Sequence, residues 1–297
     1  MQDEPYMRDD VQVPHRRQPP TVRMRRLAAE LRRLRETAGL SQEDVTAQTG
    51  VNVATLYRIE TGRTKPQPRT LHALLTAYGV TDRDRDALVH LQKDAGKRGW
   101  LHPSDSGLPE QYTAYINFEA EAREILNFET IFVPGLLQTA HYAREVISGV
   151  LPTATDDQVQ RRVDARLKRQ LLLTAPDSPR LWAVIDEAAL HRRVGGPTVM
   201  RDQLRHLAAQ ARNPQITIQV VPFKAGAHPG MPGSFIILRF GVIAPDIVYI
   251  DSMGGDLFLE EEAELIRHNM VFEHLRAVAL SPSDTATLLK ALSEDQD

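Results

Sequence analysis

The chain has 297 residues, a net charge of −3, 42% hydrophobic and 25% charged residues. This is the balance of a folded globular protein with room for two domains. The absence of cysteine excludes disulfides and cysteine-based zinc fingers and fits a reducing cytoplasm. No apolar run approaches the roughly 20 residues that span a bilayer, and residues 1–20 lack the apolar core of a secretory signal. We therefore expect a cytoplasmic protein with no membrane partner.

The charges are distributed unevenly along the chain. Residues 15–70 hold 12 Lys and Arg against 5 Asp and Glu, a net charge of +7, whereas residues 101–297 hold 18 against 26, a net charge of −8. A basic segment of this kind suits the phosphates of a nucleic acid, and the acidic remainder would be repelled by them. Without a further motif, a solvated basic face explains the first segment equally well.

The polar, proline-containing residues 1–20 are predicted to be a disordered arm. The basic residues His15, Arg16, Arg17, Arg23, Arg25 and Arg26 could touch a DNA backbone or minor groove, although a loose tail is the favoured interpretation. Leucines 27, 31 and 34 then have helical spacing up to Gly39, which predicts the first helix. Patterns over residues 70–78 and 82–97 predict two more helices further on.

Between the first helix and the one over residues 70–78, the sequence predicts two short helices joined by a tight turn. Ser41 can cap the first in a capping box with Asp44, and Gly50 stops it. Asn52 can cap the second, which Gly62 ends. With the helix before them, these two have the shape of a DNA-reading helix-turn-helix. We therefore expect a five-helix DNA-binding domain over residues 21–98.

Residues 99–111 have the composition of a linker, and residues 112–297 are predicted to form an α+β domain. Its pattern is helical from Tyr112 through Ile125, and Pro134 suits the start of a helix running to about Ser148. Residues 156–173 are predicted to form an amphipathic helix rich in arginine. A solvated or ion-paired face is favoured there over a second DNA contact, because aspartates interleave with the arginines.

Strand-like runs follow at residues 181–185, 216–221, 234–240 and 247–250, with a helix at 198–212 between the first two. The last three runs are joined by loops, so we expect a small, mainly antiparallel sheet. Helices over residues 260–280 and from Ser281 toward Leu292 close the chain. The predicted fold class is α+β, with an all-α helix-turn-helix domain in front.

Two stretches carry a family resemblance. Residues 39–44 (Gly-Leu-Ser-Gln-Glu-Asp) and 59–63 (Ile-Glu-Thr-Gly-Arg) resemble the helix-turn-helix of the Xre/Cro repressor family. The resemblance implies binding to double-stranded DNA, with Glu60 paired to Arg35 beneath the recognition helix. It implies a phosphate or base contact from Gln42. The implied base-reading residues are Val53, Ala54, Thr55 and Arg58, and those implied to hold the backbone are Arg63, Lys65 and Arg69.

Four later segments, residues 133–139, 186–192, 194–196 and 220–223, resemble the domain that follows the helix-turn-helix in Scr-type, antitoxin-like transcriptional regulators. This resemblance implies a regulatory domain that pairs with a small protein encoded nearby.

The sequence offers only weak candidates for catalytic, metal-binding or phosphate-binding sites. Asp186 and Glu187 precede His191 by about one helical turn, but a helix cap and a surface histidine explain them better than acid–base catalysis. His268 and His274 are six residues apart, which is not the spacing of a metal pair. The glycine-rich residues 226–233 lack the Lys-Ser or Lys-Thr of a phosphate loop and suit a flexible loop that contacts a partner or covers a pocket. We therefore expect no enzyme, cofactor or metal site.

The leading expectation is a sequence-specific transcriptional regulator. A homodimer is expected because one short recognition helix covers few base pairs. The alternative is an antitoxin-like component that binds a small protein encoded nearby and uses DNA binding for autoregulation.

Overall fold

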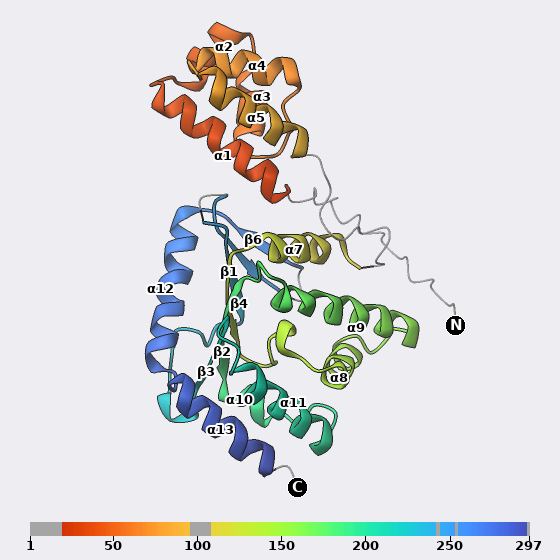
Figure 1. The fold of residues 1–297 in the computed structure, drawn as a ribbon. Coiled ribbons are helices and arrows are strands. Elements are labelled where there is room, and N and C mark those ends of the chain that lie inside the picture. The colour runs from red at the N-terminus through yellow and green to blue at the C-terminus, as the bar shows by residue number, and fades with distance from the viewer. Residues whose placement is uncertain (1–19, 96–107, 242–243, 253–254, 296–297) are drawn as a thin grey trace, which may run out of the picture.

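A computed structural model describes residues 20–95, 108–241, 244–252 and 255–295, which form a helical unit (20–95) and a sheet unit (108–295) (Figure 1). Most of the predicted arm 1–20 and most of the predicted linker 99–111 lie outside the described residues. Glu110 and Gln111, which the sequence assigned to the linker, already belong to a helix. Within the described part of the chain, no helix is both long and apolar enough to span a membrane.

The helical unit contains the five expected helices: α1 (Val22–Thr37), α2 (Gln42–Thr49), α3 (Val53–Glu60), α4 (Pro68–Ala77) and α5 (Asp82–Asp94). The first helix begins before the predicted leucines, because the Thr21 side chain accepts a hydrogen bond from the Met24 N–H and so caps it. The five helices enclose one apolar core with members from each of them, including Leu31, Val45 and Leu56.

The sheet unit is built on six strands: β1 (Glu124–Glu129), β2 (Arg180–Asp186), β3 (Ile216–Val221), β4 (Phe235–Arg239), β5 (Ile247–Ile250) and β6 (Leu257–Leu259). Their order in the sheet is β3-β2-β1-β4-β5-β6. The β1–β2 and β2–β3 pairs are parallel, and the β1–β4, β4–β5 and β5–β6 pairs are antiparallel. The prediction of a mainly antiparallel sheet was therefore wrong, because the sheet is mixed.

Part of the error comes from the central strand β1, which pairs in parallel with β2. The sequence predicted helix through Ile125, yet helix α7 (Glu110–Glu121) ends before it and residues 124–129 form a strand. Helices pack over both faces of β1: Ile125 packs into the core with α7, and Leu126 and Phe128 pack into the opposite core. Such a strand lacks the alternating polar face that identifies a half-exposed strand.

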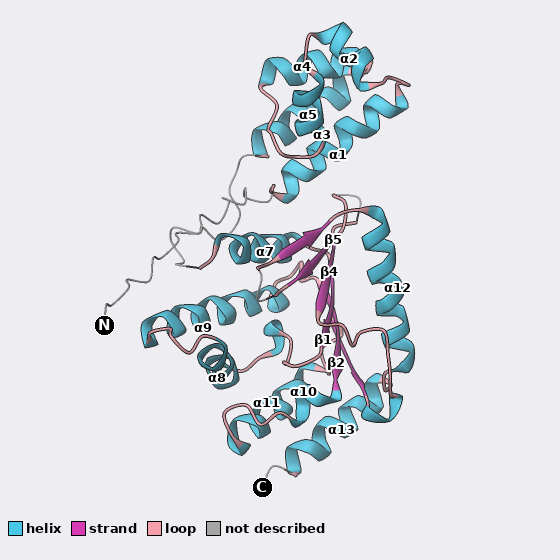
Figure 2. Ribbon diagram, turned by 180° about the vertical axis from the view of Figure 1, so that it is seen from behind, coloured by secondary structure: helices cyan, strands magenta, loops and turns pink. Residues whose placement is uncertain are grey.

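Helices cover both faces of the sheet (Figure 2). On one face, α12 (Glu262–Val278) places Phe272 and Leu275 against Phe128. On the other lie α7, α8 (Ala140–Val150), α9 (Asp156–Gln170) and α11 (Pro197–Gln210), while α10 (Glu187–His191) follows β2 directly. The last helix, α13 (Pro282–Glu294), packs on α11 and β3. The helix expected from Pro134 is a short 3-10 turn, Gly135–Leu137, and Thr139 caps α8 after it.

The first turns of α1 connect the two units. Val22 belongs to the core of the sheet unit, and Arg25 is only 4% exposed. Arg25 Nη2 donates to the Asp246 carbonyl oxygen at 3.1 Å, and its Nε lies 3.3 Å from a Glu260 carboxylate oxygen. The orientation of α1 is thus tied to the sheet unit through a buried cation.

Candidate nucleic-acid interface

The α2–turn–α3 segment has the capping that the sequence predicted. Ser41 Oγ accepts the Asp44 N–H at 3.1 Å while Asp44 Oδ2 accepts the Ser41 N–H at 2.9 Å, which completes a capping box. The hydrogen bonds from Ser41 lower the pKa of Asp44. Gly50 ends α2 with φ of +71°, a conformation that disfavours other residues, and Asn52 caps α3. These local bonds fix the length of the turn before α3.

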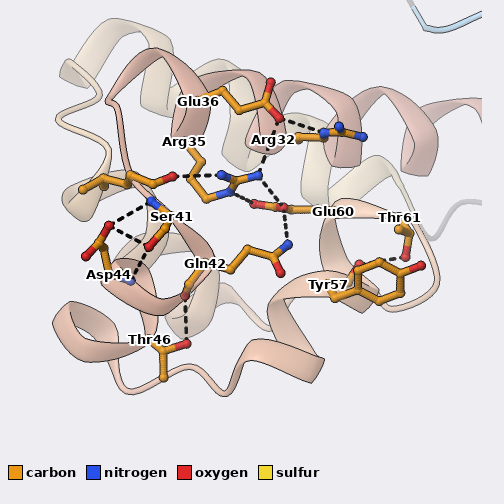
Figure 3. A network of polar contacts seen from close by, with 11 residues as sticks. Arg32, Arg35, Glu36, Ser41, Gln42, Asp44, Thr46, Tyr57, Glu60 and Thr61 are labelled. Atoms are coloured by element: carbon orange, nitrogen blue, oxygen red, sulfur yellow. Dashed lines mark hydrogen bonds and ion pairs between the residues drawn. The ribbon is translucent and has the colours of Figure 1, made fainter. Parts of the chain in front are cut away.

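A bidentate ion pair lies beneath α3 (Figure 3). Arg35 Nε donates to Glu60 Oε1 at 2.7 Å, and Nη2 donates to Oε2 at 3.2 Å. Arg35 also donates to the Leu40 carbonyl oxygen at 2.8 Å, which ties α1 to the start of α2. Hydrogen bonding to Glu60 raises the pKa of Arg35. The two residues expected to support the recognition helix are thus placed in contact.

The Gln42 side chain joins the same pair. Its Nε2 donates to Glu60 Oε2 at 3.0 Å (Figure 3). The sequence assigned Gln42 to a phosphate or base contact, but the structure places the side chain inward, where it holds the start of α2 against α3. The backbone remains suited to a phosphate, because the first N–H groups of a helix have no partner within the helix.

The outer face of α3 presents Ala54 and Arg58, both exposed, with Val53 and Thr55 partly buried beside them. The buried residues Leu56, Ile59 and Glu60 lie on the opposite side. The four residues that were expected to read bases therefore lie on one region of the α3 surface.

Tyr57 shares this face, although it was not among the assigned residues. It is 46% exposed, and at helical spacing from Ala54 and Thr61 it belongs to the same stripe. The guanidinium of Arg63 lies 5.6 Å from the centre of its ring. In the sequence, the indication of this role was a large aromatic residue at a position of the helix that does not face the core.

The cations expected to hold the DNA backbone lie in the segment that follows α3. Arg63, Lys65 and Arg69 are all exposed. Lys65 Nζ donates to the Lys93 carbonyl oxygen at 3.3 Å, which anchors this segment to α5, and Gln92 Nε2 donates to the Pro66 carbonyl oxygen at 2.9 Å. A basic, anchored segment beside the exposed face of α3 has the charge and position for phosphate contacts.

In the sheet unit, the acid–base candidates separate into two pairs. Asp186 Oδ1 accepts the Ala188 N–H and caps α10, as the favoured interpretation required. Its other oxygen lies 3.1 Å from Nε2 of His228, a residue that the sequence did not connect to it, while Glu187 lies 3.3 Å from His191. Among the described residues, no group of three His, Asp or Glu could hold a metal ion.

The arginine-rich helix α9 is not simply a solvated face. Arg169 is buried and bonds to Glu119 of α7, whereas Arg166 donates to Gln138 at 2.8 Å. Both arginines therefore bind other side chains of the sheet unit. The exposed Arg161 conforms to the expected surface position.

A half-buried carboxyl group, that of Glu129, lies at the end of β1. Burial raises the pKa of Glu129 to about 7, and the nearby Asp251 adds to the shift against the opposing effects of Ser234 and Arg166. Because the pKa in the folded state exceeds the unfolded value, the proton stabilises the fold. This contribution is complete below the unfolded pKa of about 4.5 and is lost as the pH rises through 7.

Glu129→Gln should therefore be as stable as the wild type near pH 4.5 and more stable above pH 7, by at most about 3 kcal/mol. Thermal unfolding between pH 4.5 and 8 measures the difference, and Glu110→Gln, on the exposed first turn of α7, is the control. If the stabilities of wild type and Glu129→Gln changed with pH in the same way, the raised pKa of Glu129 would be refuted.

Comparison with known proteins matches both units. Residues 26–88 match the family model described as "Helix-turn-helix domain". The chain is similar to the "HTH-type transcriptional regulator DdrOP3" of Deinococcus deserti, with 37% identity over 59 residues, which are 20% of this chain and 46% of that protein. The chain therefore spans less than half of this relative. No solved structure matches the chain.

Residues 112–291 match the family model described as "Domain of unknown function (DUF5753)". Because this match covers more than half of the chain, the protein belongs to the family defined by DUF5753, and it carries a helix-turn-helix domain in front of that domain.

Proposed function

We propose that the protein is a transcriptional regulator that reads double-stranded DNA with α3 in the major groove. The observation that carries the proposal is the exposed stripe of α3, with Ala54 and Arg58 on the surface and the basic segment of residues 63–69 beside it. A helix can enter the major groove only if one face is free, and phosphates need cations next to it. The helix-turn-helix match supports this proposal.

Within the stripe, we assign base reading chiefly to Arg58 and Tyr57. Val53 and Ala54 can meet thymine methyl groups but make no hydrogen bonds with their side chains. Thr55 is partly buried and offers one hydroxyl. Arg63, Lys65 and Arg69 are assigned to the DNA backbone, where they fix the position of the helix without reading sequence.

Arg58→Ala is expected to weaken binding to the cognate operator by about 1 to 3 kcal/mol and to leave binding to random DNA nearly unchanged. Titration of both DNAs at one fixed salt concentration measures the two losses. Arg69→Ala is the matched control, because loss of a phosphate contact should weaken binding to both DNAs equally. Equal losses for Arg58→Ala on both DNAs would refute its base-reading role.

We further propose that the protein acts in the cytoplasm as a homodimer on a symmetric operator, since two recognition helices double the contacts.

The Xre/Cro and Scr-type resemblances support a regulatory role for the sheet unit and a small protein partner encoded nearby. Co-expression with the neighbouring gene product should yield a stable complex in size-exclusion chromatography. Elution of the chain alone would argue against the partner.

A further inference from the structure

A cavity of about 290 Å³ lies where the carboxyl ends of β1, β2 and β3 meet at one edge of the sheet. Thr130 follows β1, Asp186 ends β2 and Pro222 follows β3, and all three line it. Residues 226–231 of the glycine-rich loop complete the wall through Gly226, His228 and Met231. Crevices at the carboxyl ends of parallel strands are frequent ligand sites in α/β sheets.

Two carboxylates lie next to each other at this edge. The Asp186 carboxylate lines the cavity, and Glu187 follows it, with one carboxylate oxygen accepting the N–H of the cavity-lining Phe223 at 2.6 Å. The basic partners of these carboxylates are imidazoles: His228 for Asp186 and His191 for Glu187.

Apolar side chains border the same cavity. Phe223 is 60% exposed and Met231 is 64% exposed, so both present apolar surface at the cavity. The Phe223 ring also offers a π face on which a cation is favoured. A ligand that satisfies both features has a positive charge and an apolar body.

The cavity wall is packed rather than loose. The His228 side chain is 7% exposed, and its ring lies edge-on to Phe128 with centroids 6.0 Å apart. A Cβ atom at Gly230 would lie 2.4 Å from Phe128 Cε1, so only glycine lets the loop approach β1 this closely. The loop therefore holds His228 beside Asp186.

We propose that this cavity binds a small organic cation, an ammonium group on an apolar body, with the ammonium at Asp186 and the body against Phe223 and Met231. This site is separate from the DNA-reading face of α3, so it would give the sheet unit a ligand of its own.

The test uses the full-length protein without DNA, so its outcome does not depend on DNA binding. Three probes of similar size are titrated to about 20 mM, because fragments of this size reach only millimolar affinity. The probes are 2-phenylethylamine as the cation, 2-phenylethanol as its neutral counterpart and phenylacetate as the anion. The readout is the NMR methyl signal of Met231, assigned through Met231→Leu.

The cation should shift the Met231 signal saturably and bind roughly five- to tenfold more tightly than the alcohol, and phenylacetate should not bind. Asp186→Asn should remove that preference while leaving the affinity for the alcohol unchanged, since asparagine caps α10 equally well. Asp177→Asn, an exposed carboxylate before the opposite end of β2, should keep the preference.

Equal binding of alcohol and amine by the wild type, binding of phenylacetate, or no shift of Met231 with the amine would each overturn the proposal. The wild-type comparison of the three probes decides the matter even if Asp186→Asn does not fold.

Discussion

Arg169→Met is expected to lower the free energy of unfolding of the sheet unit by about 3 to 5 kcal/mol, because it leaves a carboxylate buried without its cation. Arg169 and Glu119 have side chains only 5% and 1% exposed. Arg169 Nε and Nη2 donate to the two Glu119 oxygens, each at 2.8 Å. Burial acts against the charge of Arg169, but the combined effects of Glu119, Tyr112 and Tyr115 outweigh it and raise the pKa of Arg169.

Two tyrosines complete this buried network. Arg169 Nη1 donates to the Tyr112 hydroxyl, and the Tyr115 hydroxyl donates to Glu119 Oε1, both at 2.5 Å. Without the guanidinium, the carboxylate would lose both of its charged hydrogen bonds, and the Tyr115 hydroxyl, which remains, cannot offset the cost of its burial. The network also joins α7 to α9, two helices far apart in sequence.

Urea unfolding monitored by Trp182 fluorescence in a Trp100→Phe background measures the loss, since Trp182 lies in β2. Arg180→Met is the matched control: its pair with Glu124 is also short, at 3.0 Å, but Arg180 is 72% exposed, so the expected change is below about 1 kcal/mol. The double variant Glu119→Leu with Arg169→Met should recover much of the stability. If Arg169→Met proved as stable as Arg180→Met, the stabilising role of the buried Arg169–Glu119 pair would be refuted.

Glu60→Ala is expected to destabilise the helical unit by about 3 kcal/mol, because Arg35 and Gln42 lose their shared acceptor beneath α3. The Glu60 side chain is 3% exposed and that of Arg35 is 12% exposed, so water can replace the carboxylate only poorly. The melting temperature of the helical unit should fall with it.

Hydrogen exchange of the full-length protein measures the effect locally, with amides of residues 26–88 exchanging roughly 100-fold faster. Glu30→Ala is the control, because its ion pair with Arg33 on α1 lies at the surface, with the Glu30 side chain 36% and the Arg33 side chain 60% exposed, and should contribute below about 1 kcal/mol. An unchanged melting temperature and unchanged exchange for Glu60→Ala would refute the supporting role of the pair.

The helical unit was predictable because its signals are local. The capping box of Ser41 and Asp44, the Asn52 cap and the left-handed Gly50 lie within a few residues of the bonds they make. The caps therefore fixed the ends of α2 and α3 from sequence alone. What sequence could not give was the inward turn of Gln42, since its partner Glu60 lies 18 residues away.

The sheet unit was harder to predict because its strands depend on distant partners. Strand β1 pairs with β2 and β4, which follow it by dozens of residues, and its apolar residues on both faces also fit a helical pattern. Strand β6 has only three residues, too few for a periodic signal. The Asp186–His228 pair spans 42 residues and exists only because the loop before β4 folds back over the sheet edge.

The central claim, that α3 reads DNA sequence, is tested most directly by selecting bound fragments from sheared genomic DNA with the purified full-length protein and sequencing them. The wild type should enrich fragments that share one recurring sequence, with binding that weakens as salt concentration rises. Arg58→Ala should lose that enrichment while still retaining DNA at low salt. Bound fragments with no shared sequence, or the same enrichment by both proteins, would contradict the account.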